Sequence, residues 1–455
     1  MRLLPRALSA LCAAAAFAAA AASAPSAELI WQQSTAAATY TTASISRHPA
    51  GGAPTFVAAT WLTTPIMVEA FNTSDNGSAL WSFAGCGHVD SAFWATTARH
   101  TQRAGDGGAV DTLAVETEAL PPAAVSVRAF DSRAPGGVPR WSFNLSSAQP
   151  ASIELSDDGS TAALACWQWN AAGAISSWLF VWDAQTGALR FSQQEPLARG
   201  GPCTLSGSGA WVAWTQGDSV AVLDGATGEQ RGSLLSMGWN TEAQISDSGE
   251  TLVFMGEEEG RIYHWNASLG DWALAHSISP PDEADWYSDS SSLSSNSATH
   301  GDVAAFGFLG GGALQARVLV YEASGANSGT LLSDYTTPKN VKLQTNTYLR
   351  SDGDLVGVAL CEERARSLAL PRHLRRTLTA PNRRAGGDSD DVPTAVLLRA
   401  GSNTPLFTFV TPGSMMGVDV LADGSDIYLA VAGKHVPANT YGNGGDAYVW
   451  RITGA

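Results

Sequence analysis

The sequence predicts an all-β protein in which one kind of four-stranded unit is repeated around a closed ring. Charged residues make up only 15% of the 455-residue chain, which contains 46 glycines, and such a composition is typical of many short strands and tight turns. Two turn motifs alternate along most of the chain. The last unit lacks a fourth strand, and an orphan strand near the N-terminus can supply it.

The first 27 residues are interpreted as a secretory signal and not as part of the fold. Arg2 and Arg6 give a basic start, an alanine-rich stretch follows, and the small residues "ASAPSA" end it. This stretch is too short and wrongly flanked for a membrane anchor. We expect cleavage after Ala24 or Ala27, and a secreted protein without a transmembrane segment. A single domain then spans residues 28–455.

The first repeated motif is a hairpin whose turn contains glycine. Its copies read "IELSDDGSTAALACW" at 153, "CTLSGSGAWVAW" at 203, "AQISDSGETLVFM" at 243, "TYLRSDGDLVGVAL" at 347 and "VDVLADGSDIYLAV" at 418. An apolar residue precedes each glycine by four positions, and alternation resumes after it. This pattern predicts a hairpin with glycine at a left-handed turn position. The acids in "SDDG" and "RSDGD" are therefore interpreted as turn residues and not as calcium ligands.

The second motif places an acid or amide residue after an apolar pair and closes a short turn with glycine. It reads "VWDAQTG" at 181, "VLDGATG" at 222, "HWNASLG" at 264 and "VYEASG" at 320, with looser copies "EAFNTSDNG" at 69, "RAFDSRAPGG" at 128, "LLRAGSN" at 397 and "YVWRITGA" at the end. Asp and Asn side chains accept bonds from the backbone of such turns. Units of roughly 40–55 residues with four short strands predict a β-propeller. Eight blades are favoured, and seven stay open because the first two units are irregular.

The two ends of the chain predict how the ring closes. The final unit supplies three strands, "MGVDVLA", "DIYLAVAG" and "AYVWRIT", and the orphan strand "ELIWQQS" begins at residue 28. If this strand completes the last blade, it closes the ring and removes a free sheet edge.

At the level of these repeats, the chain resembles the quinoprotein-like and WD-repeat propeller superfamilies. The repeats "VWDAQTGALRF" and "VLDGATGEQRG" carry the resemblance, and Trp81 and Trp141 stand where quinoprotein repeats place a blade-locking tryptophan. The pyrroloquinoline-quinone dehydrogenases of this group use adjacent cysteines and a calcium-binding Glu, Asn and Asp set. Adjacent cysteines are absent here, and Trp182–Asp183 is the only Trp-Asp pair. The resemblance therefore implies the fold and does not imply a cofactor.

One face of the ring is expected to carry the binding surface. In a four-stranded blade, the connections after the first and third strands share one face, and here they are mostly compact turns. The other face receives longer and less regular loops, and binding usually resides on such loops. The candidate ligand surface consists of Trp169, Asn170, Trp239, Asn240, Glu257, Glu258, Glu259, Asp282, Glu283, Asp285, Trp286, His435 and Tyr441.

Two chemistries are conceivable on this surface, and each has a simpler alternative. The tryptophans offer faces for stacking on sugar rings, but most tryptophans of a β-rich chain pack in its core. The acids offer hard oxygen ligands for calcium, but their spacing is not that of an EF-hand, so we expect solvated loops. No metal site and no cofactor are predicted.

The functional prediction is a secreted, non-catalytic binding or protein-interaction scaffold. The sequence contains no HExxH, GxSxG or Walker-type motif, although propeller enzymes assemble sites from several blades. The alternatives are a propeller enzyme, either a quinoprotein-like oxidoreductase or a glycan-cleaving enzyme, and a lectin-like glycan-binding module. A net charge of −16 disfavours nucleic acid as a partner. A protein or glycan ligand and a monomeric state are expected.

Residues 362–391 differ from the rest of the chain. They contain seven arginines and interrupt the seventh unit between its second and third strands. A disordered surface insertion, or translated non-coding sequence, is favoured over a basic docking or cleavage loop, because a ring tolerates such insertions well.

Two kinds of covalent modification are also expected. N-glycans are expected at the sequons of Asn72, Asn76, Asn144 and Asn266 if the host is eukaryotic. Cys166 and Cys203 fall in neighbouring units, both toward the irregular-loop face, and a disulfide between them is predicted. Cys86 and Cys361 are expected to be unpaired, because their units are too far apart around the ring.

Overall fold

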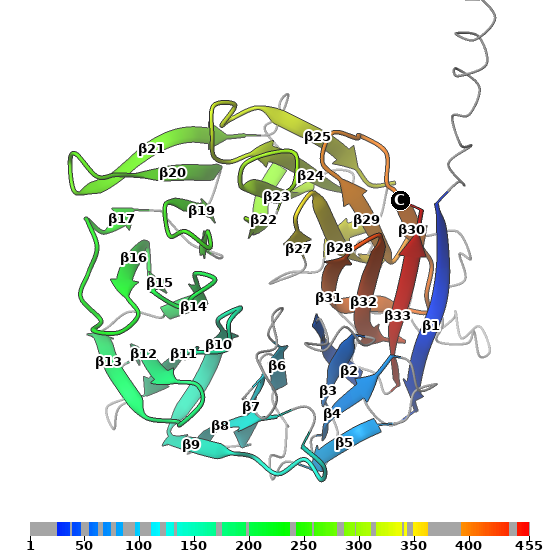
Figure 1. The fold of residues 1–455 in the computed structure, drawn as a ribbon, viewed down its shortest axis with the longest axis horizontal. Helices are drawn as coiled ribbons and strands as arrows, with labels where there is room; N and C mark the ends of the chain where they lie inside the picture. Colours follow the sequence, from blue (N-terminus) through cyan, green and yellow to red (C-terminus); the bar gives the residue numbers. More distant parts are fainter. Residues whose placement is uncertain are drawn as a thin grey trace, which may run out of the picture.

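Eight sheets stand around a common axis like the blades of a propeller, as the computed structural model shows (Figure 1). All 33 elements of the described residues are β-strands, so the predicted all-β, eight-bladed ring is confirmed. The structure describes residues 25–36, 39–46, 54–61, 67–73, 79–84, 96–100, 111–118, 124–131, 134–169, 175–196, 200–236, 243–256, 259–279, 286–295, 297–310, 315–338, 341–343, 349–362, 393–435 and 444–454.

Blades 1 to 4 each contain four strands that are consecutive in the chain. Their bounds, blade by blade, are β2 (Thr39–Ser46), β3 (Thr55–Trp61), β4 (Met67–Asn72) and β5 (Ala79–Ala84); β6 (Thr96–His100), β7 (Thr112–Glu118), β8 (Ala124–Phe130) and β9 (Trp141–Ser146); β10 (Ala148–Leu155), β11 (Thr161–Trp169), β12 (Ile175–Asp183) and β13 (Leu189–Pro196); and β14 (Gly200–Leu205), β15 (Trp211–Gln216), β16 (Ser219–Asp224) and β17 (Leu235–Ser236).

Blades 5 to 8 continue the series. Blade 7 has its innermost strand in two pieces, and blade 8 takes its outer strand from the N-terminus. Their bounds are β18 (Ala243–Ile245), β19 (Thr251–Met255), β20 (Gly260–Asn266) and β21 (Asp271–Ile278); β22 (Trp286–Ser294), β23 (Val303–Gly310), β24 (Gln315–Glu322) and β25 (Leu331–Thr336); β26 (Val341–Leu343), β27 (Leu349–Asp352), β28 (Leu355–Glu362), β29 (Ala395–Arg399) and β30 (Phe407–Phe409); and β31 (Ser414–Asp423), β32 (Asp426–Lys434), β33 (Gly445–Thr453) and β1 (Ser26–Thr35).

The N-terminal strand closes the ring, as the sequence predicted. β1 runs antiparallel to β33, from the Ser26–Thr453 pair to the Thr35–Gly445 pair. Figure 1 shows the first and last strands of the chain side by side at the outer edge of one blade. Blade 8 is thereby built from both ends of the sequence.

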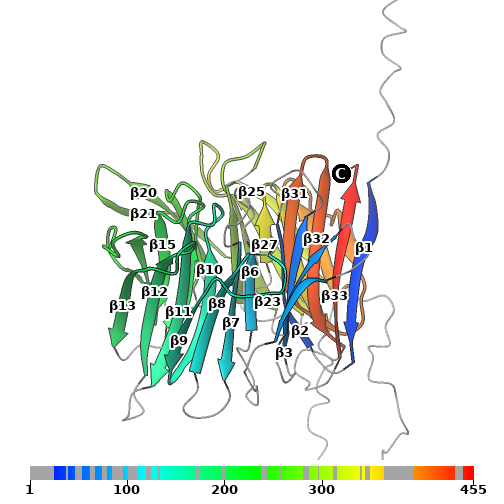
Figure 2. The ribbon, with the colours of Figure 1, turned by 60° about the horizontal axis from the view of Figure 1, so that its bottom comes forward.

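The strands run between two faces of the ring (Figure 2). We call the face that carries the connections after first and third strands the turn face, and the opposite face the irregular-loop face. On the turn face, the glycines of the first-motif hairpins all have positive φ, as predicted: Gly159, Gly209, Gly249, Gly353 and Gly424. The basic insertion leaves the ring on the irregular-loop face, because β28 ends at Glu362 and β29 begins at Ala395. Its remaining residues lie outside the described part of the chain.

The hydrophobic core is divided among the seams between neighbouring blades. The described residues form eight buried clusters, and each cluster draws its side chains mainly from two adjacent blades. Alternate residues of one strand therefore contribute to different seams, since successive strand side chains point to opposite sides of the sheet. In β11, Leu164 packs toward blade 2 and Ala165 packs toward blade 4.

This alternation explains why the predicted disulfide between Cys166 and Cys203 is wrong. Both thiols are free and buried. Cys166 belongs to the seam between blades 2 and 3, whereas Cys203 packs on the other side of blade 3, in the seam between blades 3 and 4. The sheet of blade 3 therefore stands between them. Cys86 and the side chain of Cys361 lie outside the described residues.

The innermost strands are joined from blade to blade by side-chain hydrogen bonds. Ser152 Oγ accepts a bond of 2.8 Å from the backbone N–H of Cys203, and Thr204 Oγ1 donates to the Ala243 carbonyl at 2.9 Å. At the closing seam, Asp419 Oδ2 accepts the N–H of Ile45 at 2.9 Å. These bonds satisfy groups that no sheet ladder reaches, so they tie the blades together around the axis.

Candidate functional site

Four of the thirteen residues predicted for the ligand surface fall within the described residues, and all four lie at the irregular-loop end of their blades. Trp169 ends β11 and Trp286 begins β22, while Glu259 precedes β20 and His435 follows β32. Side chains are described only for Glu259 and His435. The other nine residues lie outside the described ranges: Asn170, Trp239, Asn240, Glu257, Glu258, Asp282, Glu283, Asp285 and Tyr441.

Glu259 joins blade 5 to blade 4 through an arginine that the sequence did not single out. Its Oε1 lies 2.7 Å from Nε of Arg261, and the same guanidinium donates to the Ser236 carbonyl at 2.9 Å. Burial by itself lowers the pKa of Arg261, but the hydrogen bonds and charges of Glu259 and Tyr263 together outweigh burial, and the pKa is raised. The pair is therefore a fixed ionic contact at this end of the seam.

His435 belongs to a second polar cluster, on blade 8. Its Nε2 lies 2.8 Å from Oδ2 of Asp446, and the hydroxyl of Tyr448 donates to the same oxygen at 2.7 Å. The His435 side chain is 33% exposed, whereas that of Asp446 is 4% exposed. The partly exposed imidazole of His435 thus lies against the buried carboxylate of Asp446.

The charge of Asp446 acts on the tyrosines around it. Burial raises the pKa of Tyr448, and the hydrogen bond to Asp446 and its charge raise it further. Across the closing seam, the pKa of Tyr40 is raised by burial, then by the charges of Glu69 and Asp446. Both phenols therefore stay protonated and neutral, and burial raises the pKa of Glu69 as well.

Bulges in the innermost strands shape the same end of the ring. One extra residue interrupts the pairing of β2, β10, β14, β22 and β31, each time in the half of the strand nearer the irregular-loop face. The inserted residues include Ala151 and Met416, which are partly buried. A bulge disrupts the ladder locally and redirects a side chain, and bulges are frequent beside functional sites. These bulges were not predicted from the sequence, because a bulge leaves no turn residue or break in composition.

Unpartnered polar groups concentrate toward this end of the ring. Among the described residues, buried side-chain atoms without a hydrogen-bond partner in the irregular-loop half of the strands belong to Thr39, Trp178, Trp214, Thr215, Ser290, Ser414 and Asp446. Most buried polar groups in proteins are hydrogen-bonded, so such a concentration marks a region that water or a ligand completes.

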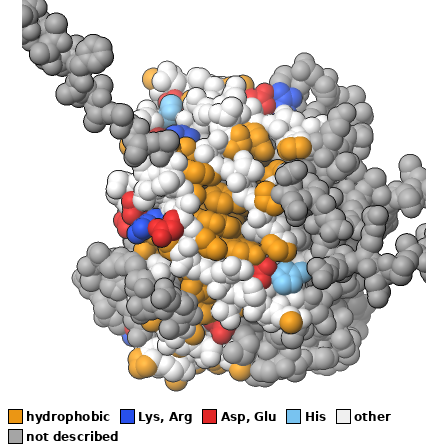
Figure 3. Space-filling model, turned by 90° about the vertical axis from the view of Figure 1, so that its right-hand side faces the viewer, with side chains coloured by type: hydrophobic (Ala, Val, Ile, Leu, Met, Phe, Trp, Pro, Cys, Tyr) orange, Lys and Arg blue, Asp and Glu red, His pale blue; other side chains and the backbone are white. Residues whose placement is uncertain are grey.

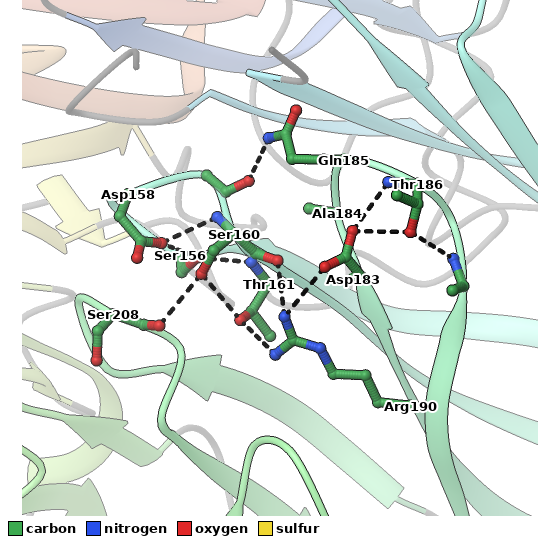
Figure 4. A network of polar contacts seen from close by, with 12 residues as sticks. Ser156, Asp158, Ser160, Thr161, Asp183, Ala184, Gln185, Thr186, Arg190 and Ser208 are labelled. Atoms are coloured by element: carbon green, nitrogen blue, oxygen red, sulfur yellow. Dashed lines mark hydrogen bonds and ion pairs between the residues drawn. The ribbon is translucent and has the colours of Figure 1, made fainter. Parts of the chain in front are cut away.

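The turn face is polar as well, but its described groups bond one another (Figure 4). Asp183 Oδ1 accepts bonds from the backbone N–H and the hydroxyl of Thr186 at 2.9 and 2.8 Å. Asp158 Oδ1 likewise accepts the backbone N–H of Ser160 at 2.9 Å. The assignment of both acids to turns is therefore confirmed, and the network leaves little unused hydrogen-bonding capacity.

The hydrogen bonds to Asp183 also lower its pKa. Burial by itself raises it, but the hydrogen bonds from Thr186 and the nearby Arg190 guanidinium outweigh burial and hold the pKa below its usual value. Asp224, in the corresponding turn of blade 4, has a lowered pKa for the same reason, with Thr227 and Ala226 as donors.

The sequons differ in how their side chains are used. Asn266 Oδ1 accepts bonds from Ser268 and Leu269, so the expected turn role of this residue is confirmed. Asn144 lies exposed on the outer strand of blade 2 and accepts a bond of 2.7 Å from Ser126. Asn72 ends β4, and Asn76 lies outside the described residues.

A hydrophobic area interrupts the polar rim of the ring. Figure 3 shows hydrophobic side chains gathered at the middle of the side that carries β1, β33 and β30. Leu29 of β1 and Val410, which directly follows β30, are 46% and 49% exposed. Exposed apolar area can mark an interface, and the expected monomeric state stays a prediction.

The described residues offer neither a metal site nor a membrane-spanning helix. No group of three or more His, Cys, Asp or Glu side chains is arranged to hold a metal ion. No helix in this part of the chain is long and apolar enough to cross a membrane.

The comparisons with known proteins identify the fold and not the family. No protein-family model matches the sequence, and no curated protein matches it either. Solved structures do match: Saccharomyces cerevisiae Sqt1, at 12% identity and a TM-score of 0.59, covers 94% of this chain and 99% of its own. The Dos1 propeller, at 14% identity and a TM-score of 0.53, covers 93% of this chain and 95% of its own.

A third structure of this kind contains a partner. It is Chaetomium thermophilum Sqt1 bound to the N-terminus of the ribosomal protein L10, at 13% identity and a TM-score of 0.53, covering 93% of this chain and 99% of its own. At these identities the likeness confirms a WD-repeat-like propeller fold. The quinoprotein part of the resemblance stays a prediction.

Proposed function

We propose that the protein is a non-catalytic scaffold that binds a partner protein on its irregular-loop face. The observation that carries the proposal is the contrast between the two faces. The turn face uses its polar groups internally, whereas buried polar groups without partners and inner-strand bulges gather at the other end. A rigid ring that holds irregular loops at one face is an arrangement that favours binding.

The nature of the partner is inferred from the chemistry of this end and from the fold. Asp446 places a carboxylate at this end, which favours a partner segment with basic residues. Chaetomium thermophilum Sqt1, which shares this fold, is bound to the N-terminus of the ribosomal protein L10. It supports a protein partner here, without identifying one.

We also propose that the chain is secreted after cleavage behind Ala24 or Ala27 and carries N-glycans. Asn144 favours this because it lies exposed on the outer strand of blade 2. Mass spectrometry of protein secreted by eukaryotic cells, before and after enzymatic removal of N-glycans, tests both statements. An unmodified Asn144 would contradict the proposed glycosylation, and an uncleaved N-terminus would contradict the proposed secretion.

The binding proposal is tested with a displayed random-peptide library and a glycan array, each screened against residues 28–455. We expect selected peptides to lose affinity when Glu259→Gln is introduced on the irregular-loop face. The same substitution on the turn face, Glu229→Gln, is the matched control and should leave affinity unchanged. Glycan binding without peptide binding would contradict the proposal and indicate a lectin. Dye reduction that depends on added pyrroloquinoline quinone and calcium would contradict it and indicate an enzyme.

A further inference from the structure

Asp446 is a buried carboxylate that the fold leaves with one unused oxygen. Its Oδ2 accepts the hydroxyl of Tyr448 at 2.7 Å, whereas its Oδ1 has no hydrogen-bond partner. Tyr448 packs in the buried cluster that blades 7 and 8 share, and side chains two positions apart on a strand point the same way. Asp446 therefore faces blade 7, at the irregular-loop end where β33 begins. A buried carboxylate is costly unless donors or a cation complete it.

The basic side chain beside this carboxylate does not complete it. His435 Nε2 lies 2.8 Å from Oδ2 of Asp446, yet Nε2 itself has no hydrogen-bond partner, so the contact lacks the alignment of a hydrogen bond. No other basic side chain in the part of the chain that the structure describes pairs with Asp446. Because the imidazole is already partly exposed, it can exchange this contact for water.

The bonding of the two carboxylate oxygens decides which cation fits. A guanidinium binds a carboxylate best as a fork, with one N–H on each oxygen. Oδ2 of Asp446 already accepts the Tyr448 hydroxyl, so this fork is blocked. An ammonium is a compact point charge that needs only one oxygen, and the four-carbon stem of lysine can carry it to a buried position. The free Oδ1 therefore favours lysine over arginine.

We propose that Asp446 anchors a lysine side chain of the partner, whose ammonium donates to Oδ1 after His435 has moved aside. Tyr448 sets the preference for lysine, because its hydroxyl keeps Oδ2 occupied. The inference rests on the proposed binding function, and it adds the residue that the partner presents and the atom that receives it.

Three displayed peptide libraries test the proposal, each with one position fixed as lysine, arginine or glutamine and each screened against the mature protein. We expect the lysine library to give the greatest enrichment, and Asp446→Asn to weaken the selected peptides about tenfold or more. Asp183→Asn is the matched control on the turn face, where Thr186 already bonds the carboxylate, and it should leave affinity unchanged. Equal enrichment from the lysine and glutamine libraries would overturn the proposal.

Two further variants respond in ways that a merely structural role would not produce. His435→Ala removes the imidazole that the ammonium must displace, so it should tighten the lysine peptides about threefold. Tyr448→Phe frees Oδ2 for a fork and should bring the affinity of arginine peptides closer to that of lysine peptides. Melting curves check that the variants fold. Weaker binding of lysine peptides by a folded His435→Ala variant would overturn the displacement and with it the proposal.

A double-mutant cycle assigns the effect to one pair of groups. Replacing the fixed lysine of a selected peptide by glutamine should cost affinity in the parent but little in Asp446→Asn, because both changes remove the same contact. Additive losses, for peptides whose exchange footprint lies on the irregular-loop face, would overturn the lysine site and leave the proposed function standing. If no library yields a binder, the proposed function fails and the lysine site fails with it.

Discussion

Arg231 of blade 4 lies at the seam between blades 4 and 5, beside tryptophans of both blades. Its guanidinium lies 4.1 Å from the ring centroids of both Trp211 and Trp265, and 5.5 Å from that of Trp272. Glu250 lies 2.8 Å from the same group, but that carboxylate is 54% exposed. The aromatic contacts therefore carry more of the stabilisation than the ion pair, which water screens.

Replacing this arginine should destabilise the ring. We expect Arg231→Ala to lower the free energy of unfolding by roughly 2 kcal/mol, through loss of cation–π contacts and of the packed side-chain stem. Arg231→Lys keeps a charge and should recover part of the loss. Urea denaturation measures the free energy of unfolding of both variants. An Arg231→Ala variant as stable as the parent would show that the contacts with the three tryptophans do not stabilise the ring.

The turn aspartates predict that stability falls in acid. Asp183 and Asp224 have lowered pKa values in the folded chain, since hydrogen bonds from their own turns outweigh burial. A carboxyl with a folded pKa below its unfolded value, about 3.9, stabilises the fold above that pH and loses its contribution as the pH falls through the folded pKa.

Thermal melts below about pH 5 measure this effect, apart from the histidine range. We expect the melting temperature to fall with acid and the Asp183→Asn/Asp224→Asn double variant to show a shallower fall. Identical slopes for parent and variant would show that the turns do not contribute.

Turn residues could be predicted from the sequence, whereas cysteine pairing could not. An aspartate followed four positions later by glycine has a local reason for its structure, since both partners lie in the same turn. The separation of Cys166 and Cys203 depends on which side of a sheet each residue faces. The bulge in β10 and the unmatched residues of β14 shift that alternation, and local sequence does not report them.

At the scale of elements, β1 carries the closure of the ring, and Trp31 is its anchor. The indole is 3% exposed, and its centroid lies 4.8 Å from Phe56 and 4.5 Å from Phe71 of blade 1. The strand thus completes the sheet of blade 8 and also packs into the seam with blade 1. The three-strand final unit predicted the pairing with β33. The packing of Trp31 could not be predicted in the same way, because Trp31 meets Phe56 and Phe71 only when the ring is closed.

Truncating this anchor should weaken closure strongly. We expect Trp31→Ala to cost about 3–5 kcal/mol, as large-to-small changes in cores do. Deletion of residues 28–34 should remove much of the cooperative stability. Leu29→Ala is the control on the same strand: Leu29 is 46% exposed, so the change should stay within about 0.5 kcal/mol. A deletion variant that melts like the parent would show that the ring closes elsewhere.

At the scale of the whole molecule, eight blades with separate seams support two faces of different character. The repeat spacing predicted the ring, and the blade topology placed the longer loops on one face. Polar groups of the turn face are hydrogen-bonded in part across blades, as Ser160 is to Ser208. Which buried groups keep no partner at the opposite end likewise depends on how neighbouring blades meet. Contacts of this kind have no signature within a single repeat.

The central claim, that the irregular-loop face binds the partner, is tested most directly by the hydrogen-exchange footprint of a peptide selected from the display library. We expect bound peptide to slow exchange at the strand ends at 167–169, 235–236 and 433–435, which lie at that face, and to leave the turns at 156–160 and 183–188 unchanged. Slowed exchange confined to the turn-face segments would contradict the claim.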